Sequence, residues 1–140
     1  MESNIIYDHN LNVADYNQLR SSVGWNAIPE KQALAGLTRS DFIIAAKDGD
    51  RTVGMSRVLT DGGSVVLILD VVVHPEYQGF GIGRALMQSV MDYVNQRIGQ
   101  GELSNVHLMA AKGKEGFYKE FGFEERPNDK SGAGMTQWIR

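Results

Sequence analysis

Apolar residues recur at three- and four-residue intervals in several stretches of the chain, and this spacing predicts amphipathic helices. Residues 12–22 form one such stretch, with Asn12 as a candidate N-cap. The positions that recur at this spacing are Val13, Tyr16, Leu19, Arg20 and Val23. The clearest helix is predicted over residues 82–98, where apolar positions follow in four-residue steps until Gly99 and Gly101. Shorter helices are expected from Pro29 in "PEKQALAGL" and in "KEGFYKEF".

Other stretches have the composition of strands. "SNIIYDH" predicts a first strand, and residues 41–75 predict three antiparallel strands joined by "KDGD" and "TDGG" turns. "NVHLMAA" and the terminal "GMTQWIR" predict two more, with a further short strand expected at 123–125. The order β-α-α-β-β-β-α-β-α-β predicts an α/β (α+β) fold: a mixed, mostly antiparallel sheet of 6–7 strands flanked by about four helices. We expect residues 1–140 to form a single domain.

Composition narrows the function classes. The 140 residues have a formal net charge of -3, which argues against nucleic acid as the main partner. This charge suits a cationic small substrate, but ordinary surface solvation explains it equally. The sequence has no cysteine, which excludes disulfides, thiolate nucleophiles and cysteine metal sites. Its three histidines lack metal-ligand spacing, so no metal is predicted. We expect no signal peptide or membrane span and a cytoplasmic location.

The segment "VVVHPEYQGFGIGRALMQSV", residues 71–90, joins a strand to the clearest helix through a glycine-rich turn. Glycines let a ligand approach the backbone closely, and the first turn of a helix offers unpaired N–H groups and a positive dipole end. These features predict an anion site, most naturally for phosphate, with Arg84 adding charge. A dinucleotide fingerprint fails because Arg84 stands where it needs glycine, and the segment lacks the Gly-Lys-Ser/Thr ending of a P-loop.

What remains is Q-x-x-G-x-G at residues 78–83, followed about 35 residues later by "FYKEFGF". Together these motifs resemble the GNAT superfamily of acetyl-coenzyme A-dependent N-acetyltransferases, and the resemblance covers nearly the whole chain. It implies a V-shaped splay between strands 4 and 5, into which coenzyme A fits. One departure concerns Ala111, since many members of the family carry asparagine at that position. Lys112 and Lys114 are candidates for meeting the cofactor phosphates instead, or are solvated loop residues.

The resemblance also implies which residues hold coenzyme A. Backbone groups on the strand before the turn would pair with the pantetheine, while their side chains pack in the core. The turn and the first helical residues would bind the pyrophosphate, mostly through main-chain N–H groups. The resulting cofactor-binding set is Val71, Val72, Val73, Gln78, Gly79, Phe80, Gly81, Ile82, Gly83 and Arg84.

Tyr118 and Asp70 are the candidate catalytic residues. Tyr118 matches the family's tyrosine, implied to protonate the departing coenzyme A thiolate. Alternatively, it is a half-buried helix residue, with Phe117 and Phe121 as better core candidates. Asp70 interrupts the apolar run "VVLILDVVV", where an unpaired carboxylate would be costly. It is therefore expected to face the cleft, as a base or as a ligand for the substrate ammonium, or else to pair with a structural partner such as Arg57.

Trp25 and Arg57 are candidate substrate-binding residues, although such residues are more often structural, Trp25 as part of the core and Arg57 as a polar residue of a hairpin. The resemblance implies direct attack of a small-molecule primary amine on acetyl-coenzyme A in a ternary complex. Direct attack agrees with the lack of cysteine for an acyl-enzyme. Two alternatives stay open: a non-catalytic acyl-coenzyme A sensor module, and an enzyme that acetylates a protein amine. A homodimer is possible, because dimers are frequent in this superfamily.

Overall fold

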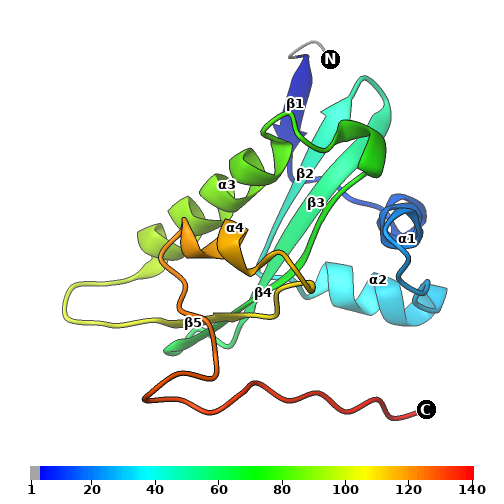
Figure 1. The fold of residues 1–140 in the computed structure, drawn as a ribbon. Helices are drawn as coiled ribbons and strands as arrows, with labels where there is room; N and C mark the ends of the chain where they lie inside the picture. The colour runs from blue at the N-terminus through cyan, green and yellow to red at the C-terminus, as the bar shows by residue number, and fades with distance from the viewer. Residues whose placement is uncertain (1–3) are drawn as a thin grey trace. The chain divides into compact units, whose positions relative to one another are not determined.

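The computed structural model describes residues 4–140 (Figure 1). It has two compact units, one reaching to His107 and one covering Leu108–Arg140, and each is described by itself. The first unit begins with β1 (Ile5–Asp8), α1 (Val13–Ser22), α2 (Glu30–Thr38), β2 (Phe42–Asp48) and β3 (Arg51–Thr60). It continues with β4 (Val65–Val73), the 3₁₀ turn η1 (Pro75–Tyr77), α3 (Ile82–Arg97) and β5 (Asn105–Leu108), whose last residue opens the second unit. The second unit contains α4 (Glu115–Lys119).

Within residues 4–140, the sheet has five strands in the order β1-β2-β3-β4-β5. β2, β3 and β4 pair antiparallel, as the Asp-Gly turns predicted, and β1 also pairs antiparallel with β2. β5 lies beside β4, and the Asn105 N–H donates to the Ser64 carbonyl, at 2.6 Å, just before β4 begins. The four helices agree with the number expected. The V-shaped splay between β4 and β5 stays a prediction.

The predicted sheet of 6–7 strands is wrong, because neither 123–125 nor 134–140 is a strand. The terminal segment carries apolar residues at Met135, Trp138 and Ile139, so alternation divides them between both faces and no register buries all three. Each is more than two-thirds exposed. After 123–125, the Asn128 side chain accepts the N–H groups of Lys130 and Ser131, which favours a turn over a strand.

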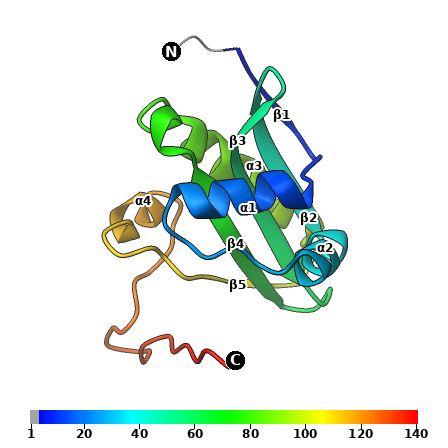
Figure 2. The same ribbon diagram turned by 90° about the vertical axis from the view of Figure 1, so that its right-hand side faces the viewer.

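α1 and α3 cover opposite faces of the sheet. Figure 2 shows α1 in front of the sheet and α3 behind it. Asn12 is the N-cap of α1 as predicted, and its side chain accepts the Asp15 N–H at 2.8 Å. Pro29 stands one residue before α2, at the N-cap rather than the first helical position. No helix within residues 4–140 is long and apolar enough to cross a membrane.

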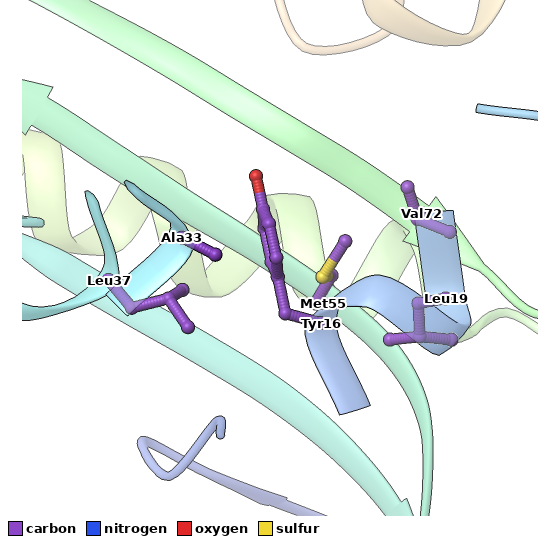
Figure 3. Packing of buried hydrophobic residues seen from close by; sticks show 6 residues of the cluster. All are labelled: Tyr16, Leu19, Ala33, Leu37, Met55 and Val72. Atoms are coloured by element: carbon purple, nitrogen blue, oxygen red, sulfur yellow. The ribbon is translucent and has the colours of Figure 1, made fainter. Parts of the chain in front are cut away.

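A core cluster fills the space between α1, α2 and the sheet (Figure 3). Its buried members are Tyr16, Leu19, Ala33, Leu37, Met55 and Val72. The ring of Tyr16 packs in this cluster, whereas its hydroxyl reaches a polar group described below. Burial of these side chains therefore fixes the helices over the same part of β3 and β4 that carries the candidate site.

On the opposite face, α3 packs very closely against β3 at Gly54. A Cβ atom at this position would lie 3.1 Å from a Leu86 methyl group and 3.2 Å from an Ile82 methyl group. Ile82 and Leu86 are both buried in the first turns of α3. The small residue on β3 therefore sets how near the N-terminus of α3 lies to the sheet.

Candidate functional site

The glycine-rich turn presents open backbone at the start of α3. Gly79 and Gly81 both have φ of 86°, a left-handed conformation that glycine adopts at little cost. No atom lies within 4 Å of a Cβ built on either residue. The first intrahelical bond runs from the Ala85 N–H to the Gly81 carbonyl, so the N–H groups of 82–84 have no acceptor within the helix. A ligand phosphate fits this combination of open backbone and helix dipole.

The pairing of β4 with β3 determines which main-chain groups lie on the strand edge that is predicted to bind pantetheine. The His74 N–H donates to the Val53 carbonyl at 2.8 Å. Hydrogen-bonded pairs alternate in an antiparallel ladder, so Val72 pairs next with Met55. The main-chain groups of Val71 and Val73 consequently turn away from β3, toward the β5 side. The Val72 side chain is buried, as expected of a core residue on this strand, and the role of its backbone stays a prediction.

The turn is anchored at its entry. Gln78 Nε2 donates to the Val73 carbonyl at 2.9 Å, which ties the turn back to the end of β4. The Tyr77 hydroxyl donates to Asp48 in the β2–β3 hairpin, and this bond is the main cause that raises the pKa of Tyr77. The Arg51 guanidinium lies 5.3 Å from the centre of the Tyr77 ring. These contacts hold the segment that leads into the glycines, whereas the Phe80 side chain between them is 55% exposed.

Asp70 lies where β4 departs from regular geometry. Its φ is 55°, and it is the only residue other than glycine with a positive φ in the part of the chain that the structure describes. The register between β3 and β4 shifts between Met55 and Arg57, opposite this point. Ser56, fully buried inside the shift, donates its hydroxyl to the Leu69 carbonyl at 3.2 Å. The irregularity is therefore held by specific bonds, as bulges near functional sites commonly are.

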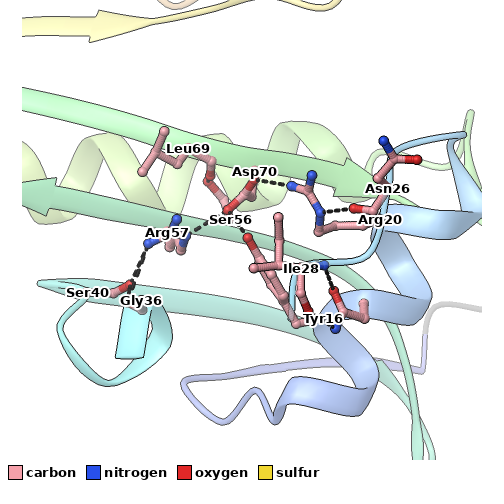
Figure 4. Close-up of polar contacts among 11 residues, drawn as sticks. Tyr16, Arg20, Asn26, Ile28, Gly36, Ser40, Ser56, Arg57, Leu69 and Asp70 are labelled. Atoms are coloured by element: carbon pink, nitrogen blue, oxygen red, sulfur yellow. Dashed lines mark hydrogen bonds and ion pairs between the residues drawn. The ribbon is translucent and has the colours of Figure 1, made fainter. Parts of the chain in front are cut away.

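Three side chains donate to the Asp70 carboxylate (Figure 4). Arg57 Nε lies 2.7 Å and the Tyr16 hydroxyl 2.9 Å from Oδ2, while Arg20 Nη1 lies 3.3 Å from Oδ1. The side chains of Arg20 and Asp70 are 11% exposed, and that of Arg57 is 17% exposed. Burial and the adjacent Asp70 raise the pKa of Tyr16, so its phenol stays neutral and donating. The carboxylate thus joins α1, β3 and β4.

The two arginines also have neutral partners. Arg20 Nε donates to the Asn26 carbonyl at 2.8 Å, and its guanidinium lies 5.3 Å from the centre of the Trp25 ring. Arg57 Nη1 donates to Ser40 Oγ at 3.2 Å and to the Gly36 carbonyl at 3.4 Å. Trp25 is half-buried and packs on the core cluster. The structure therefore brings Asp70 and Arg57 together directly and connects Trp25 to them through Arg20.

Tyr16 and Arg20 belong to the site as well, although neither was expected there from the sequence. The signal was present, since Arg20 shares the helix face of Val13, Tyr16 and Leu19, where a charged residue is unexpected. A charge on an apolar stripe needs a buried partner. Asp70, itself a lone charge in an apolar strand, is that partner.

Tyr118 belongs to the second unit. It is 8% exposed, and burial raises the pKa of its phenol. Its ring centre lies 5.0 Å from that of Phe117 and 6.5 Å from that of Phe123. Phe117 and Phe121 are only partly buried, so the expectation that they are better core residues than Tyr118 is wrong. The cause is the chain reversal at Gly122, with φ of 91°, which brings Phe123 onto the Tyr118 ring.

Metal-ligating side chains do not gather anywhere in residues 4–140: no group of three or more His, Asp or Glu residues is placed to hold an ion. Lys112, Lys114 and Arg84 are exposed, as are most residues around the glycines. The candidate site of the first unit therefore consists of the open glycine turn, the β4 edge and the Asp70 group, which is Asp70 with its donors Tyr16, Arg20 and Arg57.

Comparisons with known proteins agree with this arrangement. The model of the acetyltransferase (GNAT) domain matches residues 38–125. The uncharacterized N-acetyltransferase ycf52 of Pyropia yezoensis is 35% identical over 127 residues, which cover 88% of this chain and 71% of the relative. Serotonin N-acetyltransferase 2 of rice, a chloroplastic protein, is 31% identical over 84% of this chain and 59% of its own length.

Solved structures show the same likeness. A probable acetyltransferase from methicillin-resistant Staphylococcus aureus superimposes with a TM-score of 0.85, at 29% identity over 96% of this chain and 99% of that one. A GNAT family protein from Streptococcus pneumoniae gives a TM-score of 0.76, at 32% identity over 98% of this chain and 97% of its own. With the family model spanning more than half of its length, the chain belongs to the GNAT family and is an acyltransferase enzyme.

Proposed function

We propose that this enzyme transfers an acetyl group from acetyl-coenzyme A to the primary amine of a small molecule. The observation that carries the proposal is the glycine turn at the start of α3, where Gly79 and Gly81 leave the backbone open. A Cβ at either position would occupy the space that a bound pyrophosphate needs. The residues present therefore fit the phosphates of coenzyme A.

Backbone groups of this chain would hold the rest of the cosubstrate. The N–H groups of 82–84 face the phosphates, and the exposed Arg84 adds a positive charge there. Val71 and Val73 turn their main-chain groups to the β5 side of β4, where the pantetheine amides find partners. The bound cosubstrate supplies an activated acetyl thioester.

Direct transfer then needs few groups. The neutral amine forms the C–N bond to the acetyl carbon, the C–S bond breaks, and the surplus amine proton passes to water. Tyr118 donates its phenolic proton to the leaving thiolate and regains one from solvent. Burial raises the pKa of Tyr118 above its ordinary 10.0, so the phenol is protonated at neutral pH, as a donor must be.

Asp70 is expected to act as a base, to bind the substrate ammonium or to pair with a structural partner such as Arg57, and its contacts favour the third role. Arg57, Arg20 and Tyr16 all donate to its two oxygens. A carboxylate so engaged has to break one of these bonds to accept a proton from an amine. We therefore assign Asp70 the task of fixing the two guanidinium groups and the bend of β4.

The test measures free thiol released from acetyl-coenzyme A across a panel of amines, for the wild type and Tyr118→Phe. Thiol release that depends on an amine supports the acetyltransferase reaction. A kcat that is at least tenfold lower for Tyr118→Phe, with little change in the Kd for acetyl-coenzyme A, supports Tyr118 as the proton donor. Unchanged kcat removes Tyr118 from the reaction. Tight binding without release for any small amine overturns the small-molecule proposal.

The panel contains a protein arm, because two of the curated relatives are named for different acceptors. One is a serotonin N-acetyltransferase of rice, and another, 31% identical over 87% of this chain, is the histone acetyltransferase TAP1 of Glycine max. Lysine-rich peptides and arylalkylamines therefore stand beside amino acids and polyamines. Release with peptides alone assigns a protein acceptor, and release with small amines alone supports the proposal.

A further inference from the structure

The group around Asp70 carries more positive than negative charge. Arg20 and Arg57 contribute two positive charges and Asp70 one negative charge, which leaves one positive charge. Among residues 4–107 neither guanidinium has a second carboxylate within ion-pair distance. Tyr16 does not supply the missing charge, because its phenol is protonated. A charge that is nearly nine-tenths buried without a counterion is costly, so an anion is expected to complete the group.

Each arginine also keeps unused donors. A guanidinium has five N–H groups. Arg20 uses Nε for the Asn26 carbonyl and Nη1 for Asp70. Arg57 uses Nε for Asp70 and Nη1 for Ser40 and Gly36. The Nη2 group of each has no acceptor within residues 4–107.

These unused donors are open to a ligand. In the part of the chain that the structure describes, no fully buried side-chain nitrogen or oxygen lacks a hydrogen-bond partner. An Nη2 atom without an acceptor is therefore not fully buried, although most of each side chain is. In Figure 4 one terminal nitrogen of Arg20 points away from Asp70. The group thus offers cationic donors that are not fully buried.

The neutral partners around the arginines do not replace an anion. The Tyr16 and Trp25 rings lie 5.8 Å and 5.3 Å from the Arg20 guanidinium, and such contacts contribute about 0.5–2 kcal/mol. Carbonyl oxygens satisfy single N–H groups but bring no net charge. What these partners do is hold the guanidinium planes still, which favours recognition of a planar anion.

From this arrangement we infer that the acceptor amine also carries a carboxylate, bound by the free Nη2 group of Arg20. A single carboxylate cancels the one uncompensated charge, whereas a phosphate dianion would exceed it. Asp70 directly precedes Val71–Val73, the backbone that the proposed function assigns to the acetyl-bearing arm. Consecutive Cα atoms are about 3.8 Å apart, so a carboxylate held beside Asp70 lies next to the backbone that the proposed function assigns to this arm. This inference rests on the proposed function and names its acceptor class: an amino acid.

The test uses matched pairs of amines that differ only in the anionic group. Tryptophan is compared with tryptamine, β-alanine with ethylamine, and β-alanine with phosphoethanolamine. The expected result is a kcat/KM at least tenfold higher for an amino acid than for its decarboxylated partner. Decarboxylated amines that react as well as, or better than, the amino acids overturn the inference while leaving the acetyltransferase reaction intact. Preference for phosphoethanolamine overturns the carboxylate in favour of phosphate.

The variant Arg20→Gln tests whether Arg20 binds the carboxylate of the acceptor. Loss of a charge-assisted bond is expected to lower kcat/KM for the amino acid by about 10- to 150-fold and to leave the decarboxylated amine nearly unchanged. The KM for acetyl-coenzyme A should not move. Arg97→Gln is the control, since Arg97 pairs with Asp41, 3.5 Å away, outside this group. Equal losses for both members of a pair would show a structural role only, and thermal melting checks that the variants fold.

Binding separates failure of this inference from failure of the proposed function. If no amine is acetylated, the same amino acids are titrated calorimetrically into the coenzyme A-bound wild type and Arg20→Gln. Binding of an amino acid that weakens at least tenfold in the variant sustains the carboxylate site and rejects the reaction. Absence of binding to any amino acid rejects the carboxylate site.

Discussion

Arg57 Nε lies 2.7 Å from Asp70 Oδ2, and this ion pair connects β3 to β4 at the residue where β4 leaves extended geometry. The pair is mostly buried, so water screens it little. It also explains how an aspartate is kept at φ of 55°, which its own side chain disfavours. Side-chain bonds and backbone bend therefore depend on each other here.

Substitutions of Asp70 separate the contribution of its ion pairs to stability from the cost of its backbone strain. Asp70→Asn keeps the shape and tolerates positive φ but removes the charge, so it should lower the free energy of unfolding by about 3 kcal/mol. Asp70→Ala and Asp70→Gly both remove the carboxylate, but glycine accepts φ of 55° without strain. The glycine variant should therefore be more stable than the alanine variant by about 1 kcal/mol. Urea unfolding measures all three, and equal stability of the last two would contradict backbone strain at this position.

Gly81 and Gly62 form a matched pair for testing the cofactor site. Both have φ near 87°, at 86° and 88°, and neither has an atom within 4 Å of a built Cβ. Alanine at either position should cost about 1 kcal/mol of stability. Only Gly81→Ala should weaken coenzyme A binding, by at least tenfold in the calorimetric Kd, because Gly62 lies in the β3–β4 turn. Equal affinities in the two variants would remove the glycine turn from the binding site.

Gly54 and Gly36 should respond to alanine in opposite directions. A methyl group at Gly54 would lie 3.1 Å from Leu86 and 3.2 Å from Ile82, so Gly54→Ala should lower the free energy of unfolding by about 1–3 kcal/mol. At Gly36, inside α2, the nearest atom is 3.8 Å away, an ordinary contact. Gly36→Ala should raise stability by about 0.5 kcal/mol through helix propensity. Chemical denaturation tests both, and a neutral Gly54→Ala would show that α3 can move outward freely.

Alkaline pH should lower the stability of the fold because the Tyr16 phenol is buried. Burial and Asp70 raise the pKa of Tyr16 above 10.0 in the folded state, whereas the unfolded chain ionises near 10.0. The stability that this shift contributes is complete below pH 10 and is lost as pH rises through the folded pKa. The slope approaches about 1.4 kcal/mol per pH unit.

Tyr16→Phe cannot show this loss. Its deficit relative to the wild type, about 1 kcal/mol at pH 7 from the missing hydrogen bond, should therefore shrink between pH 10 and pH 11. Unfolding curves measured at half-unit intervals give the comparison. A deficit that stays constant over this range would mean that the Tyr16 phenol titrates alike in both states.

Much of the fold could be predicted because its signals are local. The four-residue apolar period of α3, the Asn12 cap and the two Asp-Gly turns depend on residues close in sequence, and each is confirmed. The terminal strand failed because strand formation depends on a partner and on a face to bury. "GMTQWIR" has the right composition, but its apolar residues fall on both sides of an extended chain.

The candidate site also has one part that could be predicted from the sequence and one part that could not. The glycine turn is a contiguous motif, so its residues could be named from the sequence alone. The Asp70 group is assembled from positions 16, 20, 57 and 70, and only tertiary structure shows that they meet. Sequence reasoning identified Asp70 as anomalous and suggested Arg57 as its partner, but the contribution of α1 was missed because a helix face gives no indication of which strand it covers.

The contact between Trp25 and Arg20 also has an optical consequence. The chain has two tryptophans, one in each unit. Trp138 is 72% exposed, whereas the Trp25 indole lies beside the guanidinium that we assign to the carboxylate. Indole emission responds to nearby charge, so neutralising that guanidinium should change the fluorescence of Trp25 and leave that of Trp138 constant. A chain with Trp138→Phe would therefore carry a built-in fluorophore that reports occupancy of the acceptor site without any turnover.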